Sequence, residues 1–438
     1  MTETDTSSEV ALDLEQPLSC RYCGRLVRGA GPMARHQGTC LDAMGRKAGQ
    51  FTTFEMFAGV GGLALGVAKA GFSHLAVIER DEVACASLQY NKARIKLMSR
   101  WPIHAVDARE VDYTPYAGRI AALCAGAPCQ PFSQGGKRKG EEDERNMFPE
   151  VFRAVREIRP EVVIIENVKG LLRKAERPYF TYLIDQLGHA DSSPNPDEHW
   201  TAHHARIREE PQTQGLRYAV SYQLVNAADF GLPQFRERVF IIAFRSDLQT
   251  QWIPLTPTHS KAALLYSQWV DGSYWLEHGL TAPELPERLA QTVERLKRCG
   301  APDGLRWKTV RDALRGLPEP VDEVDNPEVP NHAGIPGARS YPGHTGSPLD
   351  YPAKTLKAGA HGVSGGENML RRADGTVRYF TIREMARLQG LPDEYVVQGA
   401  WTRGMRQLGN AVPVDLAEVV ARRVRELLEQ RIGLARAA

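Results

Sequence analysis

Residues 51–245 alternate short apolar runs with amphipathic stretches of helical length, and no other feature constrains the fold as strongly. The apolar runs lie at 51–57, 75–79, 103–106, 119–124, 161–165, 222–226 and 239–244. Strands that alternate with helices predict a largely parallel sheet with crossover helices. We therefore expect an α/β, doubly wound domain. Such domains bind ligands at the carboxyl ends of their strands, so the residues that follow each run are the first candidates for a site.

Composition excludes few functions. The 438 residues carry 55 Lys and Arg against 53 Asp and Glu, so the formal net charge of +2 is no evidence for a polyanionic partner. No apolar run reaches the roughly 18 residues of a membrane span. Seven cysteines, an odd number, do not indicate a disulfide framework, and a reducing cytoplasm is expected. The polar residues 1–17 contain no signal-peptide core and are expected to be disordered.

A cluster of metal-ligand residue types follows in a module at 18–42. Its members are Cys20, Cys23, His36 and Cys40, spaced as Cys-x2-Cys, twelve residues, His-x3-Cys. Thiolates and an imidazole at this spacing can close a tetrahedron around Zn²⁺, so the sequence predicts a zinc-finger-like module. Its arginines make it basic, and contact with phosphates, binding of a protein and a purely structural role are all open.

A glycine-rich turn after the first predicted strand indicates a nucleoside cofactor. The segment Phe57-Ala58-Gly59-Val60-Gly61-Gly62 leads into a helix, whose N-terminus supplies positive potential. Glu79 ends the second strand, where a ribose-binding carboxylate belongs. Gly59 and Gly61 also fit the dinucleotide pattern, so these residues leave the nucleoside undecided. Asp107, after the third strand, is expected either to bind an adenine amino group or to cap a helix.

The fourth apolar run leads into a cysteine that is a candidate nucleophile. Pro128-Cys129-Gln130 follows this run, and a glycine-rich, charged segment follows at 134–145. A thiol at a strand end suits attack on a large substrate, although an arbitrary cysteine is more often a buried core residue. Glu166 ends the next strand and is expected to face the same site, with a solvated side chain at the strand end as the alternative. Arg236 and Arg238 alternate on an extended segment and are expected to point the same way, toward a phosphate or carbonyl.

The rest of the chain divides into three parts. The polar segment 188–215 contains four histidines and is expected to be a surface insertion without a fixed metal spacing. Residues 246–378, rich in Gly, Pro, Trp and Tyr, predict a smaller irregular domain that suits specificity, with a structural insertion as the alternative. Residues 379–434 predict helices.

Six motifs in this order resemble the cytosine-5 DNA methyltransferases of bacterial restriction-modification systems, over residues 51–430. The motifs are Phe57-x-Gly59-x-Gly61-Gly62, Pro128-Cys129-Gln130, Glu166-Asn167-Val168, Gln234-x-Arg236-x-Arg238, Arg383-Glu384-x-Ala386-Arg387-Leu388-Gln389 and Gly409-Asn410-x-Val412-Pro413. The resemblance implies the S-adenosylmethionine-dependent methyltransferase fold with a doubly wound mixed sheet. It also implies that residues 246–378 form a target-recognition domain. The module at 18–42 lies outside the resemblance.

The resemblance further implies a role for each motif. Cys129 would add as a thiolate to carbon 6 of a flipped cytosine, and Glu166 would hold or protonate its N3. Arg238 would hold the base carbonyl or Glu166, and Arg236 a neighbouring phosphate. Asn410 and Val412 look like residues that pack the last helix on the cofactor domain. The residues implied to bind S-adenosyl-L-methionine are Phe57, Gly59, Gly61, Gly62, Glu79, Asp107, Pro128 and Asn410.

Double-stranded DNA is the implied partner, with a cognate restriction endonuclease encoded nearby. A monomer in the bacterial cytoplasm, close to the nucleoid, is expected. The rivals are a tRNA methyltransferase, a catalytically dead DNA-binding relative and a dinucleotide-dependent oxidoreductase. The long segment 246–378 favours DNA over tRNA, and intact Cys129, Glu166 and Arg238 favour an active enzyme. An oxidoreductase leaves Pro128-Cys129 unexplained.

Overall fold

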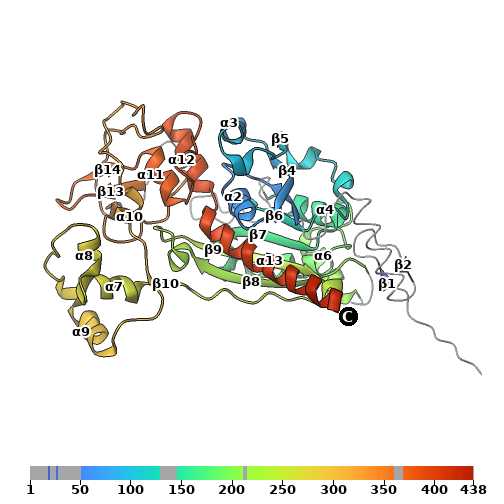
Figure 1. Cartoon of the computed structure of the whole chain (residues 1–438). Coiled ribbons are helices and arrows are strands. Elements are labelled where there is room, and N and C mark those ends of the chain that lie inside the picture. The colour runs from blue at the N-terminus through green and yellow to red at the C-terminus, as the bar shows by residue number, and fades with distance from the viewer. Residues whose placement is uncertain are drawn as a thin grey trace, which may run out of the picture.

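A mixed sheet forms the centre of the molecule in the computed structural model, which describes residues 18–19, 26–27, 51–128, 146–210, 215–359 and 368–437. Among these residues, seven strands are ordered β5-β4-β3-β6-β7-β9-β8 (Figure 1). The first five run parallel, whereas β9 is antiparallel to both β7 and β8. The α/β fold expected from the alternation is therefore present. The strands are β3 (Thr52–Met56), β4 (Ser73–Glu79), β5 (Ile103–Ala105), β6 (Ala122–Ala125), β7 (Val162–Val168), β8 (Tyr218–Asn226) and β9 (Glu237–Arg245).

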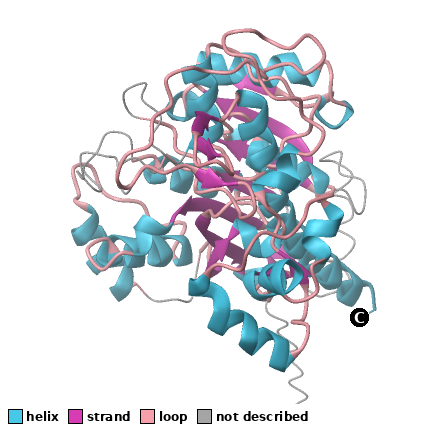
Figure 2. Cartoon of the chain, turned by 90° about the vertical axis from the view of Figure 1, so that its left-hand side faces the viewer, coloured by secondary structure: helices cyan, strands magenta, loops and turns pink. Residues whose placement is uncertain are grey.

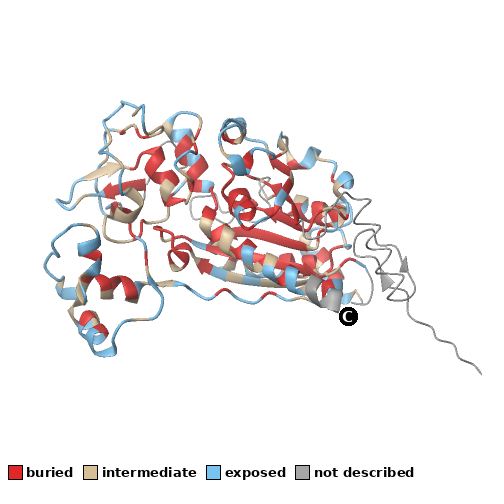
Figure 3. Ribbon diagram, viewed as in Figure 1, coloured by how far each residue is buried: buried red, intermediate tan, exposed pale blue. Residues whose placement is uncertain are grey.

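Helices cover both faces of this sheet, and its strands are largely buried between them (Figures 2 and 3). Successive strand residues point to opposite faces. Phe54 and Leu123 pack beneath α4 and α5, whereas Cys124 and Ile164 pack on the other face, beneath α2 and α13. Both faces of the parallel strands are thus apolar, which explains their continuous hydrophobic runs. The helices are α2 (Gly62–Lys69), α4 (Phe148–Ile158), α5 (Arg177–Gly188) and α13 (Val414–Ala437).

One carboxyl group interrupts this apolar interior. Glu55 of β3 is fully buried, and neither of its carboxyl oxygens has a hydrogen-bond partner within the described chain. Its neighbour in register on β6 is Cys124. Burial raises the pKa of the Glu55 carboxyl well above its ordinary value. The neutral acid is the form that this part of the core accommodates, because a buried isolated charge is costly.

The C-terminal helices return to the sheet domain, where α13 packs against α2. α11 (Ile382–Leu388) and α12 (Trp401–Asn410) precede α13. A Cβ on Gly66 of α2 would collide with the Val414 carbonyl oxygen, so α13 can approach α2 only over a glycine. Ser87 of α3 (Glu82–Lys92) donates to Gln407 Oε1 at 2.7 Å, which fixes α12 beside α3 (Figure 1). No described helix, α13 included, is long and apolar enough to cross a membrane.

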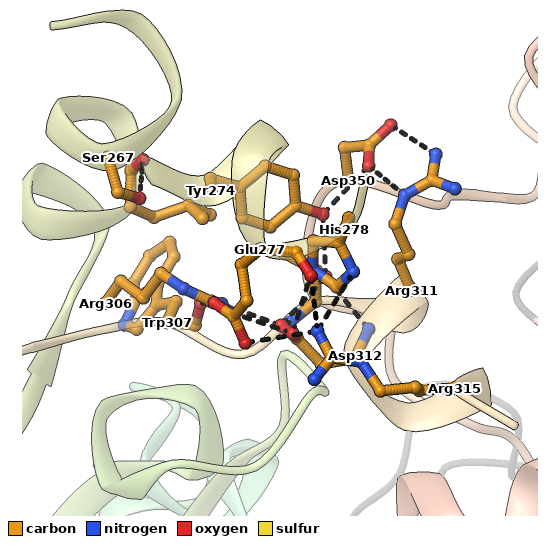
Figure 4. A network of polar contacts seen from close by, with 12 residues as sticks. Ser267, Tyr274, Glu277, His278, Arg306, Trp307, Arg311, Asp312, Arg315 and Asp350 are labelled. Atoms are coloured by element: carbon orange, nitrogen blue, oxygen red, sulfur yellow. Dashed lines mark hydrogen bonds and ion pairs between the residues drawn. The ribbon is translucent and has the colours of Figure 1, made fainter. Parts of the chain in front are cut away.

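Residues between β9 and α11 form a smaller lobe that is more regular than its sequence predicts. Short helices and two small sheets build it, and a polar network joins its elements (Figure 4). Asp350 accepts from Tyr274 Oη at 2.8 Å and from Arg311 Nε at 2.6 Å, and Arg306 pairs with Asp312 at 2.7 Å. The elements are α7 (Lys261–Trp269), α8 (Ser273–Glu277), α9 (Ala290–Cys299), α10 (Val310–Leu314), β10 (His259–Ser260), β11 (Leu305–Arg306), β12 (Ser347–Pro348), β13 (Met369–Arg371) and β14 (Val377–Tyr379).

The histidine-rich segment after α5 contains a helix, α6 (Trp200–Glu209), which its polar sequence did not predict. Ile207 of this helix is fully buried in the main core. His203 is also buried and lies 3.0 Å from the Tyr182 hydroxyl, and His204 pairs with Asp185 at 2.8 Å. These histidines therefore belong to hydrogen-bonded packing between α5 and α6.

Candidate active site

The glycine turn begins with a backbone conformation that side chains rarely adopt. Phe57 has φ 58° and Gly59 φ 53°, both in the left-handed region. For a bulky residue such as Phe57 this conformation is strained, and such strain gathers at ligand sites. Phe57 and Gly59 line a cavity, as expected. Gly61 and Gly62 do not line it, contrary to our expectation of cofactor contact.

Packing explains these last two glycines. Gly61 has φ 81° and immediately precedes α2. A Cβ on Gly61 would lie 2.8 Å from the Leu88 side chain. A Cβ on Gly62 would collide with the Val412 carbonyl oxygen. Glycine at position 61 therefore leaves room for Leu88, and glycine at position 62 lets the segment between α12 and α13 approach the turn.

Glu79 is held at the carboxyl end of β4 by three backbone donors. Gly59 N–H donates to one carboxylate oxygen at 2.7 Å. The N–H groups of Arg80 and Asp81 donate to the other, each at 2.8 Å. This carboxylate thus ties the glycine turn to the start of α3 and faces the cavity. A fixed, half-buried carboxylate is the acceptor that ribose hydroxyls need.

Asp107 caps a helix, one of the two roles expected for it, and its place on the cavity wall leaves the other role open to it. It caps the 3₁₀ helix Ala108–Glu110 by accepting from the Arg109 backbone N–H, and it also lines the cavity. Arg109 donates to it from Nε at 3.0 Å and from Nη2 at 2.7 Å, and Arg80 Nη1 donates at 3.1 Å. The Arg109 guanidinium holds the pKa of Asp107 well below its usual range. Asp107 is therefore a firmly ionised acceptor.

Glu166 and Arg238 form an ion pair at the end of β7. Arg238 Nε lies 2.7 Å from Glu166 Oε1, and both side chains are mostly buried. Burial raises the pKa of the Glu166 carboxyl, although Arg238 and then Arg236 pull it down. Desolvation thus outweighs the attraction of the arginines, so Glu166 can hold a proton more readily than an exposed glutamate.

Arg236 is not available for the phosphate contact that we predicted. It is fully buried, and its guanidinium donates to three main-chain carbonyls. The acceptors are Leu356 O at 3.0 Å, Gly409 O at 2.8 Å and Ala411 O at 2.8 Å. It lies outside the cavity lining. Arg236 therefore ties the chain before β9 to the end of α12, and only Arg238 of the pair reaches the site.

The predicted nucleophile, Cys129, lies outside the described residues, but the residue before it is described. β6 and β7 are parallel neighbours with Ala125 opposite Ile165, so Pro128 and Glu166 follow at the same edge of the sheet. Both line the cavity. Cys129 is the next residue in the sequence. The predicted zinc ligands Cys20, Cys23, His36 and Cys40 also lie outside the described residues, and within the described ones no cluster of three or more His, Cys, Asp or Glu could hold a metal.

A second wall of the cavity comes from α12 and was missed by sequence reasoning, apart from Asn410. Arg403, Arg406 and Asn410 are exposed and all line the cavity. Their spacing of three and four residues places them on one helix face. The opposite face is buried, with Met405 and Leu408 in the core. This amphipathic spacing was the available signal.

The cavity has a volume of about 750 Å³ and runs from the glycine turn to the Glu166–Arg238 pair. It can hold a nucleoside between Phe57, Glu79 and Asp107, with its other end toward Pro128 and Glu166. Fold and cavity together indicate a class, an α/β protein with a nucleoside-sized cavity at its strand ends that is bordered by a buried carboxylate able to hold a proton.

A family model, C-5 cytosine-specific DNA methylase, matches residues 51–195 and 203–426. The chain therefore belongs to the C-5 cytosine-specific DNA methylase family. It is a DNA (cytosine-5-)-methyltransferase that uses S-adenosyl-L-methionine.

Individual relatives agree. The type II methyltransferase M.Eco47II of Escherichia coli is 30% identical over 391 residues, which cover 87% of this chain and 80% of the relative. The type II methyltransferase M.NgoMIV of Neisseria gonorrhoeae is 27% identical over 385 residues, which cover 87% of this chain and 99% of the relative. Among solved structures, the S. pombe Dnmt2 methyltransferase matches with a TM-score of 0.51 and 17% sequence identity, and the match covers 87% of this chain and 99% of that chain. An identity this low supports the fold alone.

Proposed function

We propose that this enzyme methylates carbon 5 of one cytosine, flipped out of a specific duplex DNA sequence, through a covalent adduct with Cys129. The observation that carries the proposal is the buried Glu166–Arg238 pair, 2.7 Å apart, at the same sheet edge as Pro128. The residue after Pro128 is the thiol that the chemistry requires.

The residues divide the reaction between nucleophile and acid. The Cys129 thiolate forms a bond to carbon 6, and the ring π pair moves to carbon 5. Glu166, in its protonated form, donates to N3 and stabilises the negative charge that develops there. Arg238 orients Glu166 and the adjacent base carbonyl. S-adenosylmethionine, when bound, supplies the methyl group to carbon 5. A water molecule then takes the carbon 5 proton, N3 returns its proton to Glu166, and the electron pair of the broken C–H bond re-forms the ring double bond as the Cys129 thiolate leaves.

The cofactor fits the described cavity in its chemistry. Glu79 accepts from the ribose hydroxyls and Asp107 from the adenine amino group, since both are carboxylates held in place by their neighbours. Phe57 offers an aromatic surface to the adenine. Pro128 and Asn410 border the reacting end of the cavity.

Residues 246–378 are proposed to read the DNA sequence in the major groove, where all four base pairs differ. The domain limits 51–245, 246–378 and 379–434 are part of this proposal. A tRNA substrate is the main rival, because the catalytic residues alone do not select between nucleic acids.

The biological role we propose is protection of host DNA beside a cognate restriction endonuclease. The type II methyltransferase names of the relatives support this role. We further propose a monomer located in the bacterial cytoplasm, at the nucleoid.

We also propose a structural zinc ion in the N-terminal module at 18–42. The strands β1 (Leu18–Ser19) and β2 (Leu26–Val27) pair antiparallel, and Cys20 and Cys23 lie between them in the sequence. Paired strands on either side of a Cys-x2-Cys sequence support a zinc site with this ligand spacing. About one zinc per chain is expected by metal analysis, lost on substitution of Cys20 and Cys23 with serine. A metal-free purified protein would contradict it.

Bisulfite sequencing of DNA from an expressing host would first identify the modified site. A duplex with a fluorinated cytosine at that site, together with S-adenosylmethionine, should then trap the wild-type enzyme covalently. The Cys129→Ala variant should bind the cofactor but form no adduct. A tRNA pool serves as the control substrate. Methylation by Cys129→Ala, or preference for tRNA, would overturn the proposal.

A further inference from the structure

The two walls of the cavity carry opposite charge. The wall built by the ends of β4 and β5 and the start of α3 presents Glu79, Asp81, Glu82 and Asp107. The wall built by α12 presents Arg403 and Arg406. A donor molecule with hydroxyls and an amino group at one end and an amino acid at the other would meet matching partners on both sides.

The cationic side chains that line the cavity differ in whether they form ion pairs. Arg80 is paired with Asp107, and Arg238 with Glu166. Arg403 and Arg406 form no side-chain hydrogen bond or ion pair, as far as the chain is described. Two uncommitted guanidinium groups therefore border a cavity whose other cations are already neutralised.

The backbone beneath these two arginines is fixed. Gln407, between Arg406 and Asn410, accepts from Ser87 of α3 and donates to Gln398 O at 2.9 Å. A Cβ on Gly409 would collide with the main chain at Ala358, so the end of α12 lies directly on that segment. The helix face that carries both arginines is thus held at one distance from the acidic wall, as a preformed site requires.

We propose that Arg403 and Arg406 form an anion subsite that holds the carboxylate at the amino-acid end of S-adenosylmethionine. The inference rests on the proposed function, because it assigns the remaining charged group of the same cofactor. Glu79 and Asp107 match only hydrogen-bond donors, whereas a guanidinium favours the carboxylate, and among the described residues of the lining the uncommitted cations are these two. A guanidinium can bind a carboxylate through two parallel hydrogen bonds. A DNA phosphate is the competing ligand.

Binding measurements without DNA test the subsite directly. Wild type, Arg403→Ala, Arg406→Ala and the double variant would be titrated calorimetrically with S-adenosylhomocysteine, which keeps the carboxylate, and with methylthioadenosine, which lacks the amino-acid end. For S-adenosylhomocysteine we expect Kd to rise about tenfold in one single variant or both, and further in the double variant, as for a lost charge-assisted hydrogen bond. The Kd for methylthioadenosine should not change.

Matched variants separate charge from position. Arg406→Lys keeps the charge without the planar fork and should recover part of the affinity. Arg422→Ala removes an exposed arginine of α13 that pairs with Glu418 and lies outside the cavity lining, and it should bind both ligands as wild type does.

The outcomes distinguish the possibilities. An equal loss of affinity for both ligands would mean a distorted cavity and would overturn the subsite. Unchanged Kd values with a raised KM for DNA would assign the arginines to a phosphate instead, and would also overturn it. If wild type binds neither ligand, the proposed function itself fails, and the subsite with it.

Discussion

The strand-end wall and the helix wall of the cavity are built on different principles. On the strand-end wall, Glu79 accepts hydrogen bonds from three backbone N–H groups, and Asp107 pairs with two arginines. The functional carboxylates themselves are therefore fixed, by partners at most 27 residues away in the sequence. On the helix wall, the side chains of Arg403 and Arg406 have no partner among the described residues, and only their backbone is fixed, in part by the contact of Gln407 with Ser87, 320 residues away in the sequence. The fixed carboxylates of the first wall are suited to recognising ligand groups at set positions. The unpaired arginines of the second wall can adjust to bind a negatively charged group of a ligand.

Glu166→Gln, compared with Arg403→Ala, should give the largest difference between a catalytic residue and a residue of the helix wall. Glutamine keeps the shape but cannot give a proton to N3, so we expect kcat to fall by about two to four orders of magnitude. Arg403→Ala should leave kcat at saturating cofactor within a fewfold of wild type. Glu237→Gln, on the neighbouring strand and exposed, is the control. Single-turnover methylation of the identified site measures all three.

The pH dependence of the same reaction gives a second measure. Because burial raises the pKa of Glu166, its protonated form persists to higher pH than in an exposed glutamate. The contribution of this acid should be complete below that pKa and decline as pH rises through it. In Glu166→Gln this decline should vanish. A Gln variant with wild-type turnover and an unchanged profile would remove Glu166 from the proton transfer.

Arg236→Met tests the connection between the walls. The variant leaves the Leu356, Gly409 and Ala411 carbonyls without their buried donor, so we expect a loss of about 3 kcal/mol of unfolding free energy. Arg238→Met should lose activity with a smaller effect on stability. Calorimetric unfolding and methylation assays separate the two. A stable Arg236→Met enzyme with a raised KM for DNA would restore the phosphate role that its burial argues against.

The site residues also show how much of the site the sequence alone could predict. Glu79, Asp107 and Glu166 were found because parallel strands bring residues that follow apolar runs to one edge. Arg236 was misplaced because the alternation rule holds only within a strand, and β9 begins at Glu237, so Arg236 precedes it. Arg403 and Arg406 belong to no strand end, and α12 reaches the cavity only through long-range contacts that no local pattern encodes. The glycines were recognised, but which of them pack and which meet a ligand depended on where Val412 lies.

Glu55→Gln tests whether the interior beneath the strand-end wall requires a neutral group. The folded-state pKa of Glu55 is raised, so the folded protein binds the proton more tightly than the unfolded chain. Stability should therefore fall as pH rises above the unfolded pKa of roughly 4.3. Glutamine should remove this fall and add about 1–3 kcal/mol of unfolding free energy at alkaline pH. Denaturant unfolding at pH values on either side of the transition measures the difference, and parallel pH profiles for both proteins would contradict it.

Arg80→Ala is expected to have the smallest effect. It tests whether one arginine of the strand-end wall contacts the cofactor directly, as we propose for the arginines of the helix wall. Arg80 lines the cavity and is more than half exposed, with one contact to Asp107. A guanidinium lying against the adenine ring would contribute a cation–π interaction, so its loss should raise the cofactor Kd by about two- to fivefold.

Arg109→Ala is the matched control for this last variant. Arg109 pairs with the same carboxylate through two hydrogen bonds but lies outside the cavity lining. If Arg80 acts only by holding Asp107, Arg109→Ala should weaken cofactor binding at least as much, because it makes the stronger contact. A larger effect from Arg80→Ala, measured by calorimetry with S-adenosylhomocysteine, would mean that Arg80 meets the cofactor itself. The strand-end wall would then combine fixed carboxylates with one adaptable cation.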